Sequence, residues 1–117
     1  MFARLMGLNV ISPGKLQQLM QKQPVSVFDV NSRQSWLTAR VLGARPLDPM
    51  GYDESDLPAD RASTLEFYCS NFTCRKAPNA ARRAKDMGYR DVYVMSAGIS
   101  GWVGASLPTE SGEKRDT

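Results

Sequence analysis

Short apolar runs alternate with amphipathic segments along most of this chain. The runs are rich in branched and aromatic side chains, as buried β-strands are. Strands are expected at 8–11, 25–30, 45–47, 65–69 and 92–95. The apolar residues between them recur at helical spacing. Helices are expected over 13–23, 32–39 and 77–87, and in a short segment that contains Ile99, Trp102 and Val103. This alternation predicts a parallel sheet covered by helices on both faces.

Local signals support two of the helix boundaries. Ser12 followed by Pro13 is typical of a helix start, with Ser12 as the N-cap. Gly88 is a natural residue just past a helix end. The acidic segment 48–61 has one glycine and two prolines, so we expect a solvated loop with at most one helical turn.

Three chemistry-bearing positions stand at the ends of expected strands. Asp29, Cys69 and Ser96 each end or follow such a run. Ligands of parallel α/β sheets bind beyond the carboxyl ends of the strands. We therefore expect these residues to share one edge of the sheet.

Composition narrows the classes of function. The chain has 117 residues, which suits one domain, and its hydrophobic fraction of 42% is ordinary for a globular protein. A net charge of +3 is too weak to indicate nucleic-acid binding. The absence of histidine removes Cys–His dyads and most zinc sites, so no metal and no cofactor are expected.

The two cysteines are too few for a disulfide scaffold. Residues 1–10 resemble neither a signal peptide nor a membrane-spanning segment. We expect no membrane association and a reducing compartment, the cytoplasm.

The stretch 64–81 concentrates the candidate chemistry. It runs from an apolar strand, through a loop that begins with Cys69, into an Ala-rich helix. Backbone N–H groups and the helix dipole converge at such a junction, where they stabilise a thiolate and bind anions. Arg75 and Lys76 stand at the expected helix start, where their positive charges interact unfavourably with the positive end of the helix dipole. An anion between them would remove this penalty. The alternative is that Cys69 is a buried structural thiol and that both cations point into water.

Four segments in order resemble the rhodanese-like family of single-domain sulfurtransferases. The segments resemble the family's Asp-Val-Arg to Gly-Ala region, its strand into the catalytic cysteine, the helix and strand that follow, and its closing Gly-Gly-Ile-x-Gly-Trp to Leu-Pro motif. In this chain they are 28–44, 67–69, 80–93 and 97–108. The resemblance implies a single rhodanese-like α/β domain over 1–110, with a central, mainly parallel five-stranded sheet, and a polar, disordered tail over 111–117.

The resemblance also implies a function. Cys69 would attack a small sulfur donor such as thiosulfate, carry the sulfur as a persulfide, and pass it to a thiol, a protein or cyanide. The loop N–H groups would stabilise the sulfur anion, and Asp29 and Asn31 would support the loop. The substrate-binding loop would consist of Ser70, Asn71, Phe72, Thr73, Cys74 and Arg75.

Several positions depart from the family pattern. Asn31 stands where many members have Arg, Ala39-Arg40 replaces Gly-His, and Ala97 replaces the first Gly of the closing motif. The loop from Cys69 to Arg75 has seven residues where the usual sulfurtransferase loop has six.

The longer loop leaves other functions open. A Cys-x5-Arg loop resembles those of cell-cycle phosphatases and arsenate reductases on this fold, in which Arg75 would bind a tetrahedral oxyanion. A non-catalytic binding module is a further alternative.

Two residues near the loop have open roles. Cys74 could resolve an oxidised Cys69 through a disulfide, or only fill the loop, which is the expectation here. Asp29 is expected to accept loop hydrogen bonds or to pair with an arginine.

Overall fold

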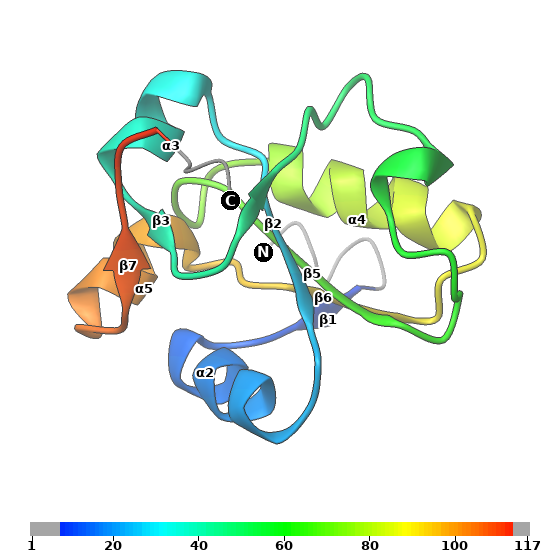
Figure 1. Ribbon diagram of the computed structural model, residues 1–117, viewed down its shortest axis with the longest axis horizontal. Helices are drawn as coiled ribbons and strands as arrows, with labels where there is room; N and C mark the ends of the chain where they lie inside the picture. Colours follow the sequence, from blue (N-terminus) through cyan, green and yellow to red (C-terminus); the bar gives the residue numbers. More distant parts are fainter. Residues whose placement is uncertain (1–7, 114–117) are drawn as a thin grey trace.

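The computed structural model describes residues 8–113. Its central sheet has five strands in the order β1-β6-β5-β2-β4, and every neighbouring pair is parallel (Figure 1). The strands are β1 (Asn9–Val10), β2 (Ser26–Asp29), β4 (Arg45–Pro46), β5 (Thr64–Tyr68) and β6 (Asp91–Val94). This is the expected five-stranded parallel sheet of a single α/β domain.

Helices cover both faces of this sheet (Figure 1). The helices are α2 (Pro13–Lys22), α3 (Arg33–Thr38), α4 (Lys76–Asp86) and α5 (Gly98–Gly104). On one face α4 contributes four buried alanines, whose small side chains let the helix lie close to β5 and β6. On the other face Leu16, Trp36 and Trp102 enter a second core from α2, α3 and α5. The expected helices are confirmed, each within a few residues of its predicted ends.

The predicted helix boundaries have their expected physical cause. The Ser12 side chain accepts a hydrogen bond from the N–H of Lys15, and Pro13 occupies the first turn of α2. Gly88, just beyond α4, has a φ of +102°, a conformation that glycine adopts without steric cost.

A second, two-stranded antiparallel sheet was not predicted. It pairs β3 (Arg40–Val41) with β7 (Thr109–Glu110), which brings the end of the domain against its middle. Two-residue strands carry too little hydrophobic pattern to be read from sequence. The registered pairs are Arg40 with Glu110 and Val41 with Thr109.

Arg40, in β3 of this small sheet, is buried with only 2% of its surface exposed. Its Nη1 donates to the carbonyl oxygens of Trp36, at 3.1 Å, and Gly112, at 2.8 Å. Its guanidinium carbon lies 4.1 Å from the centre of the Trp36 ring, and Nε lies 3.5 Å from a Glu110 carboxylate oxygen. These contacts compensate a buried charge.

The domain limit expected at residue 110 stays a prediction. Within the expected tail, the Gly112 N–H donates to the Leu37 carbonyl at 2.8 Å, and Arg33 pairs with Glu113. Residues 114–117, and the expectation of disorder there, lie outside the described residues.

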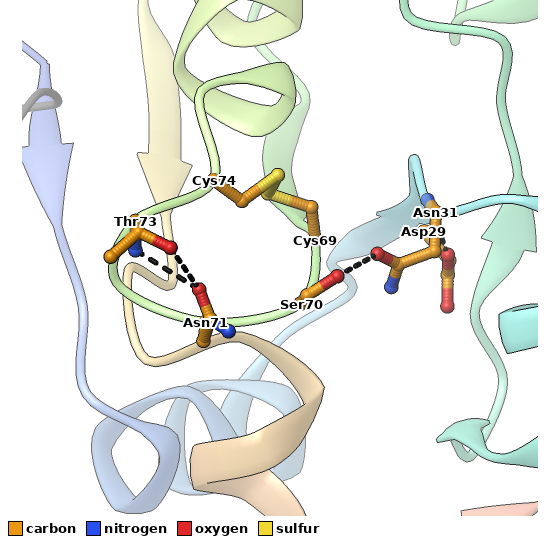
Figure 2. The surroundings of a disulfide bond; sticks show 7 residues. All are labelled: Asp29, Asn31, Cys69, Ser70, Asn71, Thr73 and Cys74. Carbon is orange, nitrogen blue, oxygen red and sulfur yellow. Dashed lines mark hydrogen bonds between the residues drawn. A yellow bond between two sulfur atoms is a disulfide. The ribbon is translucent and has the colours of Figure 1, made fainter.

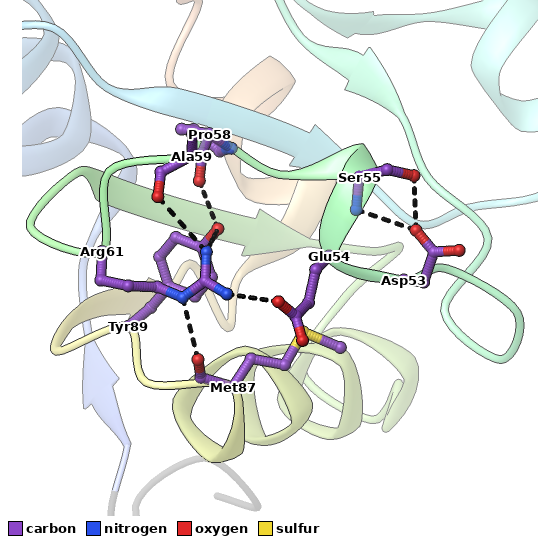
Figure 3. Close-up of polar contacts among 8 residues, drawn as sticks. All are labelled: Asp53, Glu54, Ser55, Pro58, Ala59, Arg61, Met87 and Tyr89. Atoms are coloured by element: carbon purple, nitrogen blue, oxygen red, sulfur yellow. Dashed lines mark hydrogen bonds and ion pairs between the residues drawn. The ribbon is translucent and has the colours of Figure 1, made fainter.

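The acidic segment 48–61 contains the one expected helical turn, η1 (Glu54–Asp56). Its end is fixed to the rest of the domain by Arg61, as Figure 3 shows. The Arg61 guanidinium donates to the Met87 carbonyl and the Tyr89 hydroxyl, and pairs with Glu54. Most of the segment is exposed, as expected of a solvated loop, but Tyr52 and Leu57 enter the core.

Glu66 is a fully buried acid in the middle of β5. The sequence pattern predicted an apolar strand here, but not the burial of this side chain. Its Oε2 accepts a hydrogen bond of 3.1 Å from the Met95 N–H, and no described residue hydrogen-bonds Oε1. Burial raises the pKa of Glu66 well above its ordinary 4.5; the Met95 N–H offsets part of this effect. The neutral acid is the form that the folded state favours.

The substitution Glu66→Gln tests this assignment. The folded protein holds the Glu66 proton more tightly than the unfolded chain does. Stability should therefore fall as pH rises from the unfolded pKa, near 4.5, toward the raised folded pKa. Relative to Glu66→Gln, the wild type should lose about 1.4 kcal/mol of unfolding free energy per pH unit within that window.

Denaturant titrations at several pH values between acid and neutral measure this difference. Glu113→Gln is the control, because it makes the same change at an exposed glutamate. Its unfolding free energy against pH shows the effect of the change at the surface. Parallel stability curves for the wild type and Glu66→Gln would show that Glu66 is ionised in the folded protein.

Candidate functional site

The candidate site is the loop between β5 and α4. Cys69 directly follows the last residue of β5, and α4 begins at Lys76. Figure 2 shows the loop curling back so that its two ends meet below the first turn of α4. All six predicted loop residues, 70–75, lie on this curve.

Cys69 and Cys74 form a disulfide, with their Cα atoms 6.4 Å apart. The expectation that Cys74 only fills the loop is therefore wrong. The physical reason is a tight turn: the Cys74 N–H donates to the Asn71 carbonyl at 3.2 Å, and the Thr73 N–H to Asn71 Oδ1 at 3.0 Å. This turn brings residue 74 back over residue 69 (Figure 2).

The two cysteines differ in exposure. Cys69 has 3% of its surface exposed, whereas Cys74 is only partly buried. The cavity beside the disulfide measures about 10 Å³, close to the smallest that holds one water. A sulfur donor therefore has no room beside Cys69 while the disulfide is intact.

The N-terminus of α5 holds the start of the loop. The Ile99 N–H donates to the Cys69 carbonyl at 2.9 Å, and the Ser100 N–H to the Ser70 carbonyl at 3.1 Å. Gly98 permits this approach: its φ is +65°, and a Cβ there would lie 2.5 Å from the Ser70 backbone. Gly98 belongs to the closing motif that the sequence shows. The contact of this motif with Cys69 and Ser70 was not predicted.

Asn31 contacts the loop from the end of β2. The Ser70 hydroxyl donates to Asn31 Oδ1 at 2.9 Å (Figure 2). Asn31 is itself placed by Asp29, whose Oδ1 accepts the Asn31 N–H at 2.8 Å. An amide side chain thus supports the loop from the end of β2.

Asp29 lies beneath the site, with 1% of its surface exposed. Its Oδ2 accepts the Tyr68 hydroxyl at 2.6 Å, and the Tyr68 oxygen in turn accepts the Val41 N–H at 3.0 Å. Burial raises the pKa of Asp29, and the hydrogen bonds from Tyr68 and Asn31 oppose that rise. Asp29 contacts residues that frame the loop, as a positioning residue does.

The cations and N–H groups expected to bind an anion are only partly available. Arg75 and Lys76 are exposed in the first turn of α4, which has no acidic residue and no side-chain cap. The N–H groups of Thr73 and Cys74 donate within the loop in this oxidised form. The described residues contain no cluster of His, Cys, Asp or Glu that could hold a metal.

Two surface hollows border the loop. One, of about 730 Å³, lies between α2 and the end of β6; Phe72 lines both this hollow and the small cavity at the disulfide. The other, of about 490 Å³, is bordered by Asn31 and Lys76. The Phe72 side chain is 59% exposed. The sequence did not predict either hollow.

Comparison with known proteins identifies the family. Residues 12–105 match the model of the rhodanese-like domain, and the chain belongs to that family. Over 115 residues it is 26% identical to the uncharacterized protein YibN of Escherichia coli, covering 91% of this chain and 75% of YibN.

Two solved structures share the fold. One is a thiosulfate sulfurtransferase from Pseudomonas aeruginosa, with a TM-score of 0.75 and 21% identity over 91% of this chain and 20% of that one. The other, from Rhodopseudomonas palustris, is a protein of unknown function described as a possible tyrosine phosphatase. Its TM-score is 0.77, with 17% identity over 93% of this chain and 91% of that one.

In the part of this chain that the structure describes, no helix has the length and hydropathy to span a membrane.

The two glycines at the ends of α5 provide a test of the loop support. Gly98→Ala should displace the loop and destabilise the fold by about 2 kcal/mol or more, because the new Cβ meets backbone and the φ is left-handed. Gly104→Ala is the matched control, since nothing lies within 4 Å of its added Cβ. It should leave stability unchanged or raise it slightly. The melting temperatures of both variants measure this difference. Equal melting temperatures would show that the close approach of α5 to the loop does not contribute to stability.

Proposed function

We propose that this protein is a sulfurtransferase that carries sulfane sulfur on Cys69. The observation that carries the proposal is the position of Cys69, at the carboxyl end of the central strand of a rhodanese-like domain and at the start of the loop that leads into α4. A thiolate there is stabilised by the N-terminus of an eleven-residue helix and by the cations Arg75 and Lys76.

The reaction begins from the reduced protein. The Cys69 thiolate attacks the outer sulfur of thiosulfate, the S–S bond of the donor breaks, and sulfite leaves with the bonding electron pair. The sulfur remains on Cys69 as a persulfide. A thiol, a protein or cyanide then accepts the outer sulfur atom, and Cys69 returns to the thiolate. The chemistry of this step uses no metal and no organic cofactor.

The disulfide makes the reaction dependent on reduction. A disulfide sulfur is not a nucleophile, so a thiol reductant must first free Cys69. This requirement suits the reducing cytoplasm, which is the location we propose.

Intact-protein mass spectrometry tests the proposal directly. Pre-reduced protein treated with thiosulfate should bind one sulfur atom at Cys69 or convert it to product, and thiocyanate should form when cyanide is added. Cys69→Ser should do neither. Thiosulfate should also leave the non-reduced wild type unmodified, because Cys69 is held in the disulfide. Thiocyanate formation by Cys69→Ser at the wild-type rate would overturn the assignment.

The same assay separates the enzyme from a binding module. Thiocyanate turnover that depends on Cys69 excludes an inert domain. If the reduced wild type forms no sulfur adduct, releases no sulfide and produces no thiocyanate, the non-catalytic alternative is favoured.

A phosphatase or arsenate reductase is a second candidate, favoured by the seven residues from Cys69 to Arg75. Two observations weigh against it. The N–H groups of Thr73 and Cys74 are occupied within the loop, so fewer donors face an oxyanion in this state. Asp29, a candidate for the general acid together with the acids of 48–60, is buried and bonded to Tyr68, so it cannot protonate a leaving oxygen at the surface.

Anion binding to the reduced protein tests this candidate. We expect neither phosphate nor arsenate to raise the melting temperature, and hydrolysis of an aryl phosphate to be no faster than with Cys69→Ser. Stabilisation of the wild type by phosphate, lost in Arg75→Ala, would show that the loop binds tetrahedral oxyanions.

A further inference from the structure

We propose that Cys74 is the resolving thiol of this site: it attacks the Cys69 persulfide, releases hydrosulfide and leaves the Cys69–Cys74 disulfide. The inference rests on the proposed sulfur transfer to Cys69 and specifies where that sulfur goes next. In this scheme the two cysteines together reduce the transferred sulfur, and the product is sulfide.

The bond between the two sulfurs determines which atom Cys74 attacks. In a persulfide the Cys69 Sγ is the inner sulfur, and the transferred atom is the outer one. The observed disulfide joins Cys74 Sγ to Cys69 Sγ, so Cys74 reaches the inner sulfur. Attack at that atom expels the outer sulfur, whereas attack at the outer atom would move it to Cys74.

The step balances without an external oxidant. The Cys74 thiolate forms a bond to Cys69 Sγ while the bond from Sγ to the outer sulfur breaks. The outer sulfur leaves as hydrosulfide with the electron pair, so it is reduced as the two cysteines are oxidised. One persulfide and one thiol give one disulfide and one hydrosulfide.

Regeneration requires two electrons, which we assign to an external dithiol. Cys74 is the more exposed of the two residues, so the dithiol attacks Cys74 Sγ first. The Cys69 thiolate then leaves at the N-terminus of α4, where the helix dipole stabilises its charge. The second thiol of the reductant resolves the mixed disulfide and frees Cys74.

The supports of the loop fit this cycle. α5 binds the carbonyls of Cys69 and Ser70, whereas in the exposed turn 71–73 the Asn71 side chain binds the N–H and hydroxyl of Thr73, within the turn. The turn with Cys74 can therefore move away on reduction while Cys69 stays in place. This opening provides the room for a donor that the oxidised cavity lacks.

A single-turnover experiment tests the inference. Wild type is reduced with dithiothreitol, freed of it under anaerobic conditions, and mixed with thiosulfate; released sulfide and intact mass are then measured. We expect close to one equivalent of sulfide and a final mass lower than that of the reduced protein by two hydrogen atoms. Cys74→Ser should retain the mass of one extra sulfur and release about tenfold less sulfide.

The double variant Thr73→Cys/Cys74→Ser is the matched control, because it keeps one loop thiol but moves it by one position. It should behave like Cys74→Ser. Sulfide release equal to that of the wild type, in either variant, would overturn the role of Cys74. Retention of the extra sulfur by the wild type, without sulfide release, would also overturn it.

Failure of the underlying function gives a different result. If Cys74→Ser takes up no sulfur while its melting temperature shows that it is folded, the sulfur transfer to Cys69 is itself wrong. If it takes up sulfur and the wild type releases none, only the resolving role is wrong.

Discussion

The contact between the N-terminus of α5 and the first residues of the loop is the constraint on which this site depends. Two N–H groups of α5 bind the carbonyls of Cys69 and Ser70, and the approach is so close that only a glycine fits at residue 98. The geometry fixes the backbone of Cys69 independently of its sulfur. The rest of the loop can therefore change its shape without moving the candidate nucleophile.

Buried polar groups beneath the site add a second layer of support. Asp29 accepts hydrogen bonds from Asn31 and from Tyr68, and Tyr68 accepts one from the N–H of Val41. These bonds join the end of β2, the end of β5 and the start of the small sheet. Because each of these groups is costly to bury unpaired, the network specifies one arrangement of the three segments.

The disulfide relates the chemistry of the loop to its state of oxidation. In the oxidised form Cys69 is covered, the adjoining cavity has space for about one water, and two loop N–H groups bond within the loop. In a reducing compartment, disulfides are usually transient and catalytic or redox-sensing. The same bond thus explains why the site is closed and indicates how sulfur would leave it.

The sequence by itself determined the class of fold and the place of the candidate nucleophile. Apolar runs and helix signals such as Ser12-Pro13 are local, so they predicted the parallel sheet, its helices and the strand end at Cys69. The tertiary structure alone decided the pairing of Cys74 with Cys69, the burial of Glu66 and Arg40, and the approach of Gly98 to the loop. Each of these joins atoms whose distance depends on how the loop turns or how separate segments pack, and no local pattern encodes that distance.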